Sequence, residues 1–351
     1  MSYDSLLLAS FGGPEGPDEV MPFLERVTAG RGVPRERLEE VSHHYLALGG
    51  VSPINDQNRA LLDALRAELD SRGIDLPLYW GNRNSAPFFA DTLREMGNAG
   101  HRSVLAVATS AYSSYSGCRQ YRENLAVART EAGLDGVLEI AKVHPYFDRA
   151  GFVAPFRRSV HDALAGLREQ GLAGDDVVVL FTTHSIPTAM AIGSGPDEGR
   201  SDELPGLYER QHLEVAEQVM ADSDVPWRLV FQSRSGPPQV PWLEPDINDA
   251  LREWAAAGAR AAVVAPIGFI SDHVEVVWDL DHEARETADE LGMELVRVPT
   301  PGTDAQFVSA LVDTVVQALA GQAPATRLCT STCCANLRTP LPTVPGVASA
   351  E

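Results

Sequence analysis

Three observations predict an α/β protein made of two Rossmann-like domains, each a four-stranded parallel sheet flanked by helices. Short runs rich in Leu, Val and Ala alternate with longer amphipathic stretches, which is typical of parallel sheets covered by helices on both faces. Eight such runs divide into two sets of four. The length of 351 residues also fits two domains of roughly 100 to 200 residues each.

The predicted strands follow one another at intervals long enough for a helix between each pair. In chain order they span residues 5–10, 77–80, 103–108, 137–141, 176–181, 227–231, 261–265 and 293–298. We place the first domain at 1–148 and the second at 149–302, with a C-terminal helix and tail, about 303–351, joining the first. The tail from residue 321 is rich in Pro, Thr, Ala and Ser, so we expect loose structure unless its cysteines fix it.

Composition narrows the classes of partner. The formal net charge of −21 disfavours general attraction to nucleic acid or anionic lipid. The start of the chain resembles a first strand rather than a signal peptide, and no run of about 18 apolar residues offers a membrane span. We therefore expect a cytoplasmic monomer without nucleic-acid partner or membrane span.

His184 closes an apolar run and is followed by a turn-like Ser-Ile-Pro. Open α/β sheets bind their ligands at the carboxyl ends of the strands, so this imidazole is a candidate catalytic base or metal ligand. A core or helix-capping histidine is the alternative.

Three acids follow the seventh predicted strand. Glu275, Asp279 and Glu283 stand four residues apart, so on a regular helix they share one face over roughly 12 Å. A solvated acidic face is the alternative, but Trp278 lies between the acids. Neutral imidazole from His184 and carboxylate from Glu275 would suit ferrous iron or zinc.

Several segments resemble signatures of the ferrochelatase family, in the family's order, over about residues 5–320. They are LASFGGP (8–14), YLALGGVSP (45–53), THSIP (183–187), FQSRS (231–235) with PWL (241–243), and FISDHVE (269–275). Independent motifs in a fixed order are far more specific than any one of them.

The resemblance implies a chelatase-like lyase that inserts Fe²⁺ into a porphyrin held in a cleft between the two domains. His184 matches the family's proton acceptor and iron ligand, and Glu275 matches the glutamate that faces it. Asp279 and Glu283 match a row of acids that offers a path for metal or protons.

The resemblance also implies porphyrin-binding residues in the first domain. Ser52 and Tyr121 match positions that contact propionates, and Arg31, with Arg119 and Arg122, could supply positive charge. A simple turn is the alternative for Ser52, and a packing role is the alternative for Tyr121.

Phe11 marks a departure from part of the family. It stands where some relatives carry a tyrosine that ligates the iron of the product. A phenyl ring cannot coordinate a metal, so we expect Phe11 to pack or stack against the macrocycle.

The four cysteines are Cys118 and a close group in the tail, Cys329, Cys333 and Cys334. Four thiolates are the right number for a 2Fe-2S cluster, and the resemblance to actinobacterial members of the family implies one. A zinc site or free thiols are the alternatives.

Within the family we expect the coproporphyrin III type, which acts in haem b biosynthesis and contacts neighbouring enzymes of that route only transiently. The cysteine set and the lack of a membrane anchor favour this branch. A protoporphyrin IX ferrochelatase, a cobalt chelatase and a non-catalytic porphyrin or haem carrier are the alternatives, and retention of the acid row disfavours the carrier.

Overall fold

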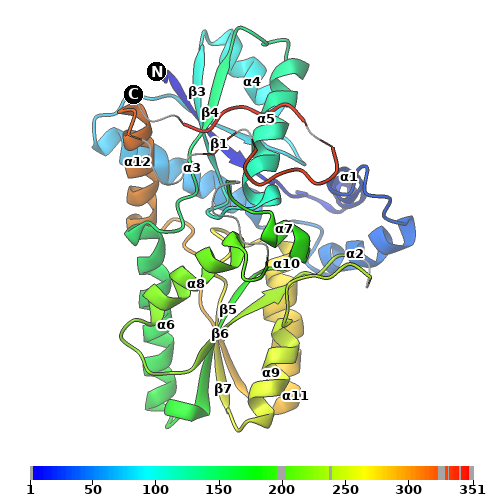
Figure 1. Cartoon of the computed structure of the whole chain (residues 1–351), viewed down its shortest axis with the longest axis vertical. Coiled ribbons are helices and arrows are strands. Elements are labelled where there is room, and N and C mark those ends of the chain that lie inside the picture. Colours follow the sequence, from blue (N-terminus) through cyan, green and yellow to red (C-terminus); the bar gives the residue numbers. More distant parts are fainter. Residues whose placement is uncertain are drawn as a thin grey trace.

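Two four-stranded parallel sheets form the framework of the protein, one above the other in Figure 1. The computed structural model describes residues 3–196, 203–236, 239–322, 329–330, 332–339 and 341–347. The strand orders are β2-β1-β3-β4 and β6-β5-β7-β8. The strands are β1 Ser5–Ser10, β2 Leu78–Asn82, β3 Ser103–Ala108, β4 Glu139–Lys142, β5 Val177–His184, β6 Trp227–Gln232, β7 Ala261–Ala265 and β8 Glu294–Arg297. The predicted fold class is confirmed.

Helices connect the strands and cover both faces of each sheet. The α-helices are α1 Pro17–Val27, α2 Arg35–Ala47, α3 Ile54–Ser71, α4 Phe89–Asn98, α5 Gln120–Glu131, α6 Ala150–Glu169, α7 Thr188–Ile192, α8 Leu207–Met220, α9 Ile247–Ala256, α10 Val274–Val277, α11 Ala284–Leu291 and α12 Ala305–Leu319. Two π-helices, η1 Tyr115–Arg119 and η3 Trp278–Glu283, and a 3₁₀-helix, η2 Gly174–Asp176, complete the described elements.

Alternate side chains of the strands enter different cores. In β1, Leu6 and Leu8 pack with α3, whereas Leu7 and Ala9 pack with α4 and α5. In β5, Val179 and Phe181 pack with α6 and α8, whereas Val178 and Leu180 pack with α9 and α11. Both central strands are therefore buried on both faces, as the apolar runs predicted.

One hydrophobic core runs through both sheets. It joins Leu6 of β1 to Phe181 of β5 through α6 and α12, whose residues Phe152 and Phe307 are 0% and 1% exposed. Helix α12 contacts α3 as well as α6, and Arg72, which follows the last residue of α3, forms an ion pair with Asp313 at 2.6 Å. The C-terminal helix therefore packs against α3 beside the first sheet.

Strand β5 is longer than the sequence pattern predicted. Its pairing with β6 continues to His184↔Gln232, three residues past the predicted end at 181, while pairing with β7 stops at Phe181↔Ala265. β-branched Thr182 and Thr183 suit this extension. His184 is therefore the last residue of β5.

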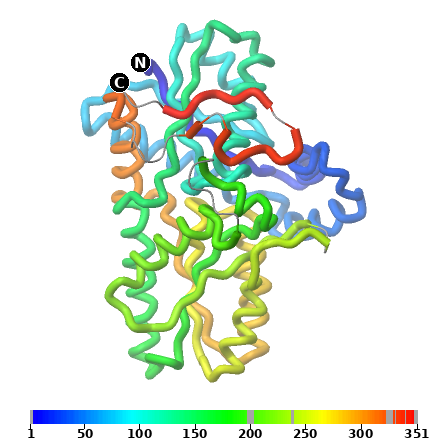
Figure 2. The backbone as a smooth tube through the Cα atoms, in the orientation of Figure 1, coloured from blue at the N-terminus to red at the C-terminus, as the bar shows by residue number. Residues whose placement is uncertain are grey.

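The tail is more ordered than its composition predicted. Val344 and Val347 are 1% and 3% exposed, and Gly346 forms a parallel bridge with Lys142 of β4. Figure 2 shows the tail, in red, running along the half that contains the first sheet. The cysteines and these backbone contacts fix the described part of the tail.

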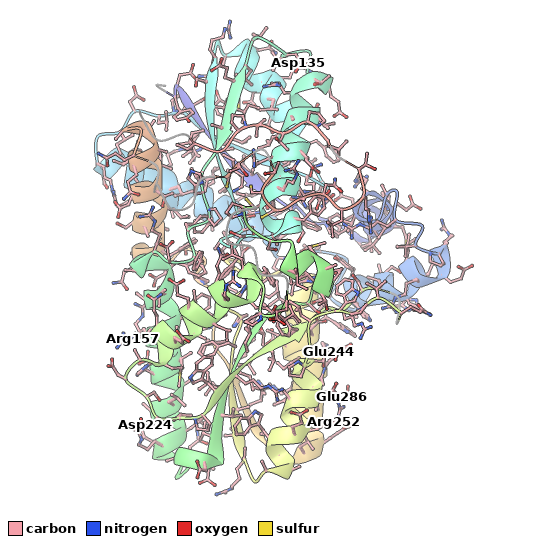
Figure 3. All side chains as sticks on the ribbon, viewed as in Figure 1. Asp135, Arg157, Asp224, Glu244, Arg252 and Glu286 are labelled. Atoms are coloured by element: carbon pink, nitrogen blue, oxygen red, sulfur yellow. The ribbon has the colours of Figure 1, made fainter. Side chains whose placement is uncertain are left out.

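No helix in the described ranges has the length and apolar character needed to cross a membrane. Many charged side chains lie on the outside of the molecule, among them Asp135, Asp224, Arg252 and Glu286, which are labelled in Figure 3.

Candidate active site

His184 lies at the carboxyl end of β5 with its tautomer fixed by the backbone. Its Nδ1 lies 2.5 Å from the carbonyl oxygen of Ser185, which can only accept a hydrogen bond. Nδ1 therefore carries the proton, and the lone pair of Nε2 is free to accept a proton or bind a metal. The side chain is 32% exposed, so a substrate can reach it.

Glu275 lies opposite His184, on the connection that follows β7 of the second sheet. It lies in the first turn of α10, after the loop that leaves β7, and its Oε2 is 3.7 Å from His184 Nε2. The backbone N–H of Gly268 in this loop donates to the carbonyl oxygen of Thr182 at 3.1 Å. The expectation that His184 and Glu275 converge from neighbouring strand ends is confirmed geometrically, since β5 and β7 pair directly.

The three acids lie on a helical segment that is not a regular α-helix. Helix α10 passes into the π-helix η3 and then into α11. In a π-helix the backbone hydrogen bonds join residues i and i+5, so a step of four residues is less than one turn. The three acids therefore do not lie on a single face of the helical segment. Glu275 and Asp279 are partly buried and Glu283 is exposed.

Asp279 is the acid with the most unusual environment. Burial, with a smaller contribution from the charges of Glu275 and Glu283, raises its pKa to about 7. Hydrogen bonds from Ser233 and Gln232 act in the opposite direction. Asp279 therefore changes protonation near neutral pH, as a group that passes on protons must.

Gln232 and Ser233 are contributors that the sequence analysis did not assign. The hydroxyl of Ser233 and the amide of Gln232, the latter at 3.3 Å, both donate to Asp279 Oδ2. Ser233 has a positive φ of 61°, a conformation that costs energy outside glycine. Both residues lie in the FQSRS motif, which was the available signal.

The half of the molecule that contains the first sheet, called the first half below, contacts this region with α1 and α2. His44 of α2 stacks on Trp278 at 4.3 Å, and Val274 packs with Phe23 and Tyr45. Trp278 Nε1–H donates to Glu283 Oε1 at 2.9 Å. Trp278 is thus a packing residue between the halves, which explains its place among the acids.

The predicted porphyrin-binding residues are only partly brought together. Phe11 and Tyr121 lie on either side of Arg83, whose guanidinium is 5.6 Å and 4.0 Å from their ring centres. Ser52 and Tyr121 are each 3% exposed, so little of either is accessible in this conformation. Arg31 lies at the surface; desolvation of part of its side chain lowers its pKa, and the charge of Glu275 acts in the opposite direction.

Arg83 was missed because only its position after β2 marks it in the sequence. Burial lowers its pKa, and its Nε–H has no hydrogen-bond partner among the described residues. Arg119 and Arg122, which we expected to supply charge to a propionate, instead face the tail, where they donate to the carbonyl oxygens of Cys333 and Val344.

The four cysteines form one group although Cys118 is distant in sequence. Cys118 Sγ lies 4.0 Å from Cys329 Sγ, and the thiols of Cys333 and Cys334 contact this pair. All four are free of disulfides. Hydrogen bonds from Cys329 and Cys334 lower the pKa of Cys118 well below its ordinary value and that of Cys333 to about 3.

Positive and donor groups surround these sulfurs. Lys142 Nζ lies 3.6 Å from Cys118 Sγ, and Arg122 Nη1 lies 3.4 Å from Cys333 Sγ. Both cations are 2% exposed. The N–H of Gly195, from the half with the second sheet, donates to Cys334 Sγ at 3.1 Å. Across the described ranges, no group of three or more His, Cys, Asp or Glu side chains is arranged to enclose a single metal ion.

Known proteins resemble this chain over most of its length. Residues 3–319 match the profile of the family described as Ferrochelatase. A coproporphyrin III ferrochelatase of Leifsonia xyli is 52% identical, covering 96% of this chain and 92% of that protein. One of Streptomyces coelicolor is 56% identical, covering 90% of this chain and 85% of that protein.

Solved structures resemble the fold at low sequence identity. The sirohydrochlorin chelatase SirB of Bacillus subtilis subspecies spizizenii, in complex with cobalt, matches with a TM-score of 0.53 and 12% identity. That match covers 89% of this chain and 94% of SirB. At this identity the likeness concerns the fold alone.

Proposed function

This chain belongs to the ferrochelatase family, and we propose that it inserts Fe²⁺ into coproporphyrin III and releases two protons. The product, iron coproporphyrin III, is an intermediate of haem b formation in this proposal. The name shared by its curated relatives supports the choice of porphyrin. The observation that carries the chemistry is the pairing of His184 Nε2 with Glu275 Oε2 at 3.7 Å.

Proton removal is the first task of the reaction, because a free-base porphyrin holds two N–H protons that must leave as the metal enters. His184 Nε2 has a free lone pair, since the Ser185 carbonyl holds the proton on Nδ1. Nε2 takes a pyrrole proton, and the nearby carboxylate of Glu275 stabilises the imidazolium that forms.

Iron must also lose water before the flat macrocycle can bind it. A neutral imidazole and a carboxylate are suitable ligands for Fe²⁺ and leave positions open for the porphyrin nitrogens. His184 and Glu275 supply this pair, and each is partly exposed.

Asp279 and Glu283 give protons or metal a path between His184 and the surface. Asp279, with a pKa of about 7, can both accept and release a proton at neutral pH. Glu283 is exposed and completes the path to solvent.

Four residues of the first half hold the porphyrin in this proposal. Phe11 packs against the macrocycle, Arg31 meets a propionate, and Ser52 and Tyr121 offer hydroxyls. Arg83 adds a guanidinium beside Phe11 and Tyr121. Because Ser52 and Tyr121 are buried, their contacts require a small opening of the first half.

The decisive experiment measures anaerobic Fe²⁺ insertion into coproporphyrin III by absorbance, comparing the wild-type chain with His184→Ala. We expect fast metallation by the wild type and a loss of about 100-fold or more in the variant. Binding of coproporphyrin without metallation by either protein would favour a carrier instead. A preference for protoporphyrin IX in competition would move the substrate to that porphyrin.

We also propose that Cys118, Cys329, Cys333 and Cys334 hold a 2Fe-2S cluster. The separation of 4.0 Å between Cys118 and Cys329 fits two thiolates on one metal, which lie about 3.8 Å apart at a metal–sulfur distance of about 2.3 Å. Bound, the cluster would supply a one-electron redox centre.

The surroundings of the sulfurs fit a group with net negative charge. Lys142, Arg122 and the N–H of Gly195 all point at ligand sulfurs. Iron and acid-labile sulfide in anaerobically purified protein test the assignment, and a colourless protein lacking both would contradict it. Free thiols and such a cluster both persist in a reducing compartment, which favours the cytoplasm.

A further inference from the structure

Tyr208 and His212 of α8 form a buried hydrogen-bonded cluster with Thr183 of β5, next to His184. The hydroxyl of Tyr208 donates to the carbonyl oxygen of His184 at 2.9 Å. It also lies 2.7 Å from Thr183 Oγ1, which in turn lies 2.9 Å from His212 Nε2. Thr183 and His212 are 1% and 0% exposed, and Tyr208 is 6% exposed. None of these contacts belongs to the path of protons or iron described above.

We propose that Tyr208 is a positioning residue for His184, held in place by Thr183 and His212. The proposal rests on the chelatase role assigned to His184. It concerns the backbone of His184 rather than the imidazole itself, because Tyr208 touches neither substrate nor reacting atoms.

The end of β5 needs such a support because its ladder with β7 has already stopped. The last β5–β7 pair is Phe181↔Ala265. Beyond it, the peptide that joins His184 to Ser185 is held on one side by Ser185 N–H, which donates to the carbonyl oxygen of Gln232 at 2.8 Å. On the other side the Tyr208 hydroxyl holds the His184 carbonyl.

This peptide controls where the imidazole points. The Nδ1–H of His184 donates to the Ser185 carbonyl, only one residue away. The ring is attached to the Cα atom of His184 and its acceptor belongs to the following peptide, so a displacement of the 184–185 peptide between them would disturb their hydrogen bond and move Nε2 from its place 3.7 Å from Glu275. Loss of the Tyr208 hydroxyl therefore affects the tautomer and direction of His184.

Counting protons assigns the donor in each contact. His212 Nδ1 lies 2.7 Å from the carbonyl oxygen of Tyr208, so it carries a proton, and burial lowers the pKa of His212 to about 3. Neutral His212 must then accept at Nε2, and Thr183 is its donor. The only hydroxyl proton left is that of Tyr208, which serves Thr183 Oγ1 and the His184 carbonyl.

Helix α8 also connects this group to the first sheet. The ring of Tyr112, in the loop after β3, stacks on His212 at 3.6 Å, and its hydroxyl donates to the carbonyl oxygen of Ile267. Ser113 N–H donates to Gln211 Oε1 at 2.7 Å, and Gln211 Nε2 returns a bond to Ser113 Oγ at 2.9 Å. These contacts link the half that contains the first sheet to the helix that carries Tyr208.

The test compares Tyr208→Phe with Tyr146→Phe in the full chain. Tyr146 is a matched control, because it is 2% exposed and its hydroxyl also donates to a backbone carbonyl, that of Ala108, at 2.8 Å. The readouts are kcat and KM for Fe²⁺ insertion into coproporphyrin III and the ¹⁵N spectrum of His184, assigned by comparison with His184→Ala.

We expect Tyr208→Phe to lower kcat about 10-fold with KM for the porphyrin changed less than about 2-fold. Its His184 signal should show a mixture of tautomers, whereas Tyr146→Phe keeps the wild-type kcat and a single Nδ1–H tautomer. Equal kcat and equal His184 signals in the two variants would overturn the inference. If the wild type does not metallate coproporphyrin III, the proposed reaction fails, and the ¹⁵N comparison still decides the role of Tyr208.

Discussion

Asp279 has a role in the proposed reaction that would come at a cost to folding stability. Its carboxyl is held between two other acids and away from water, so its pKa rises to about 7 from an ordinary 3.8. The folded protein thus binds this proton more tightly than the unfolded chain does. Between about pH 4 and pH 7 the free energy of unfolding falls as pH rises, and above pH 7 the charged carboxylate is a full penalty.

Asp279→Asn should therefore stabilise the protein at pH 8 while slowing iron insertion. We expect a gain of roughly 1 to 3 kcal/mol in the free energy of unfolding at pH 8 and almost none at pH 4. We expect kcat to fall about 10-fold or more. Urea unfolding at both pH values, with the exposed Asp289→Asn as control, checks the first claim. Equal stabilities at pH 8 would contradict it.

The sequence predicted individual chemical groups best where they lie in motifs at strand ends. His184 and Glu275 were found because carboxyl ends of neighbouring parallel strands share one edge. Ser233 and Arg83 were not, because a positive φ and burial between two rings arise only from tertiary structure. The direction of Arg122 was also hidden, since the tail that it contacts lies 222 residues away.

Among the secondary-structure elements, the two central strands were predicted unequally well: β1 to the residue, and β5 three residues short at its carboxyl end. β1 matched because its run of apolar residues is bounded clearly, whereas β5 continues through two threonines to His184. The π-helix η3 was read as a regular α-helix, since helical periodicity does not distinguish an i to i+5 segment of six residues.

The loop after β7 approaches β5 closely at Gly268. Substitution of this glycine tests how much the position of β5 depends on that contact. A Cβ at Gly268 would lie 2.2 Å from Thr183 Oγ1 and 2.8 Å from Thr183 Cα. Gly268→Ala should push the loop away from β5 and destabilise the protein by about 1 to 3 kcal/mol. Iron insertion should fall as well, because Thr183 precedes His184.

Gly166→Ala is the matched control for that variant. A Cβ at Gly166, within α6, would meet no atom within 4 Å. This change should leave activity unaltered and stabilise the protein by about 0.5 to 1 kcal/mol. Thermal unfolding and steady-state kinetics measure both variants. Similar behaviour of the two would show that the loop yields freely at Gly268.

Three distant parts of the molecule meet at the cysteines. Cys118 belongs to the first half, the other three to the tail, and Gly195 to the half with the second sheet. Gly195 both donates to Cys334 Sγ and accepts from the Cys334 N–H at 2.9 Å. A cluster here would hold the tail and both halves together.

Cys334→Ser should therefore lower both cluster content and thermal stability. We expect a decrease in Tm of about 3 °C or more, because metal binding contributes directly to folding. Leu337→Ser is the control, since Leu337 lies in the tail and is 64% exposed. Differential scanning calorimetry and iron analysis measure the effects. A Tm and an iron content equal to wild type would argue against this role.

The short tail segment beside β4 has a consequence beyond stability. β4 is the edge strand of the first sheet, and the tail meets it with two backbone bonds, Lys142 N–H to Pro345 O and Val347 N–H to Lys142 O. An uncovered edge strand offers its free backbone groups to other chains. The pairing of residues 345–347 with Lys142 covers backbone groups at the end of β4 that another chain could otherwise pair with, so we expect a chain that released them to self-associate more readily.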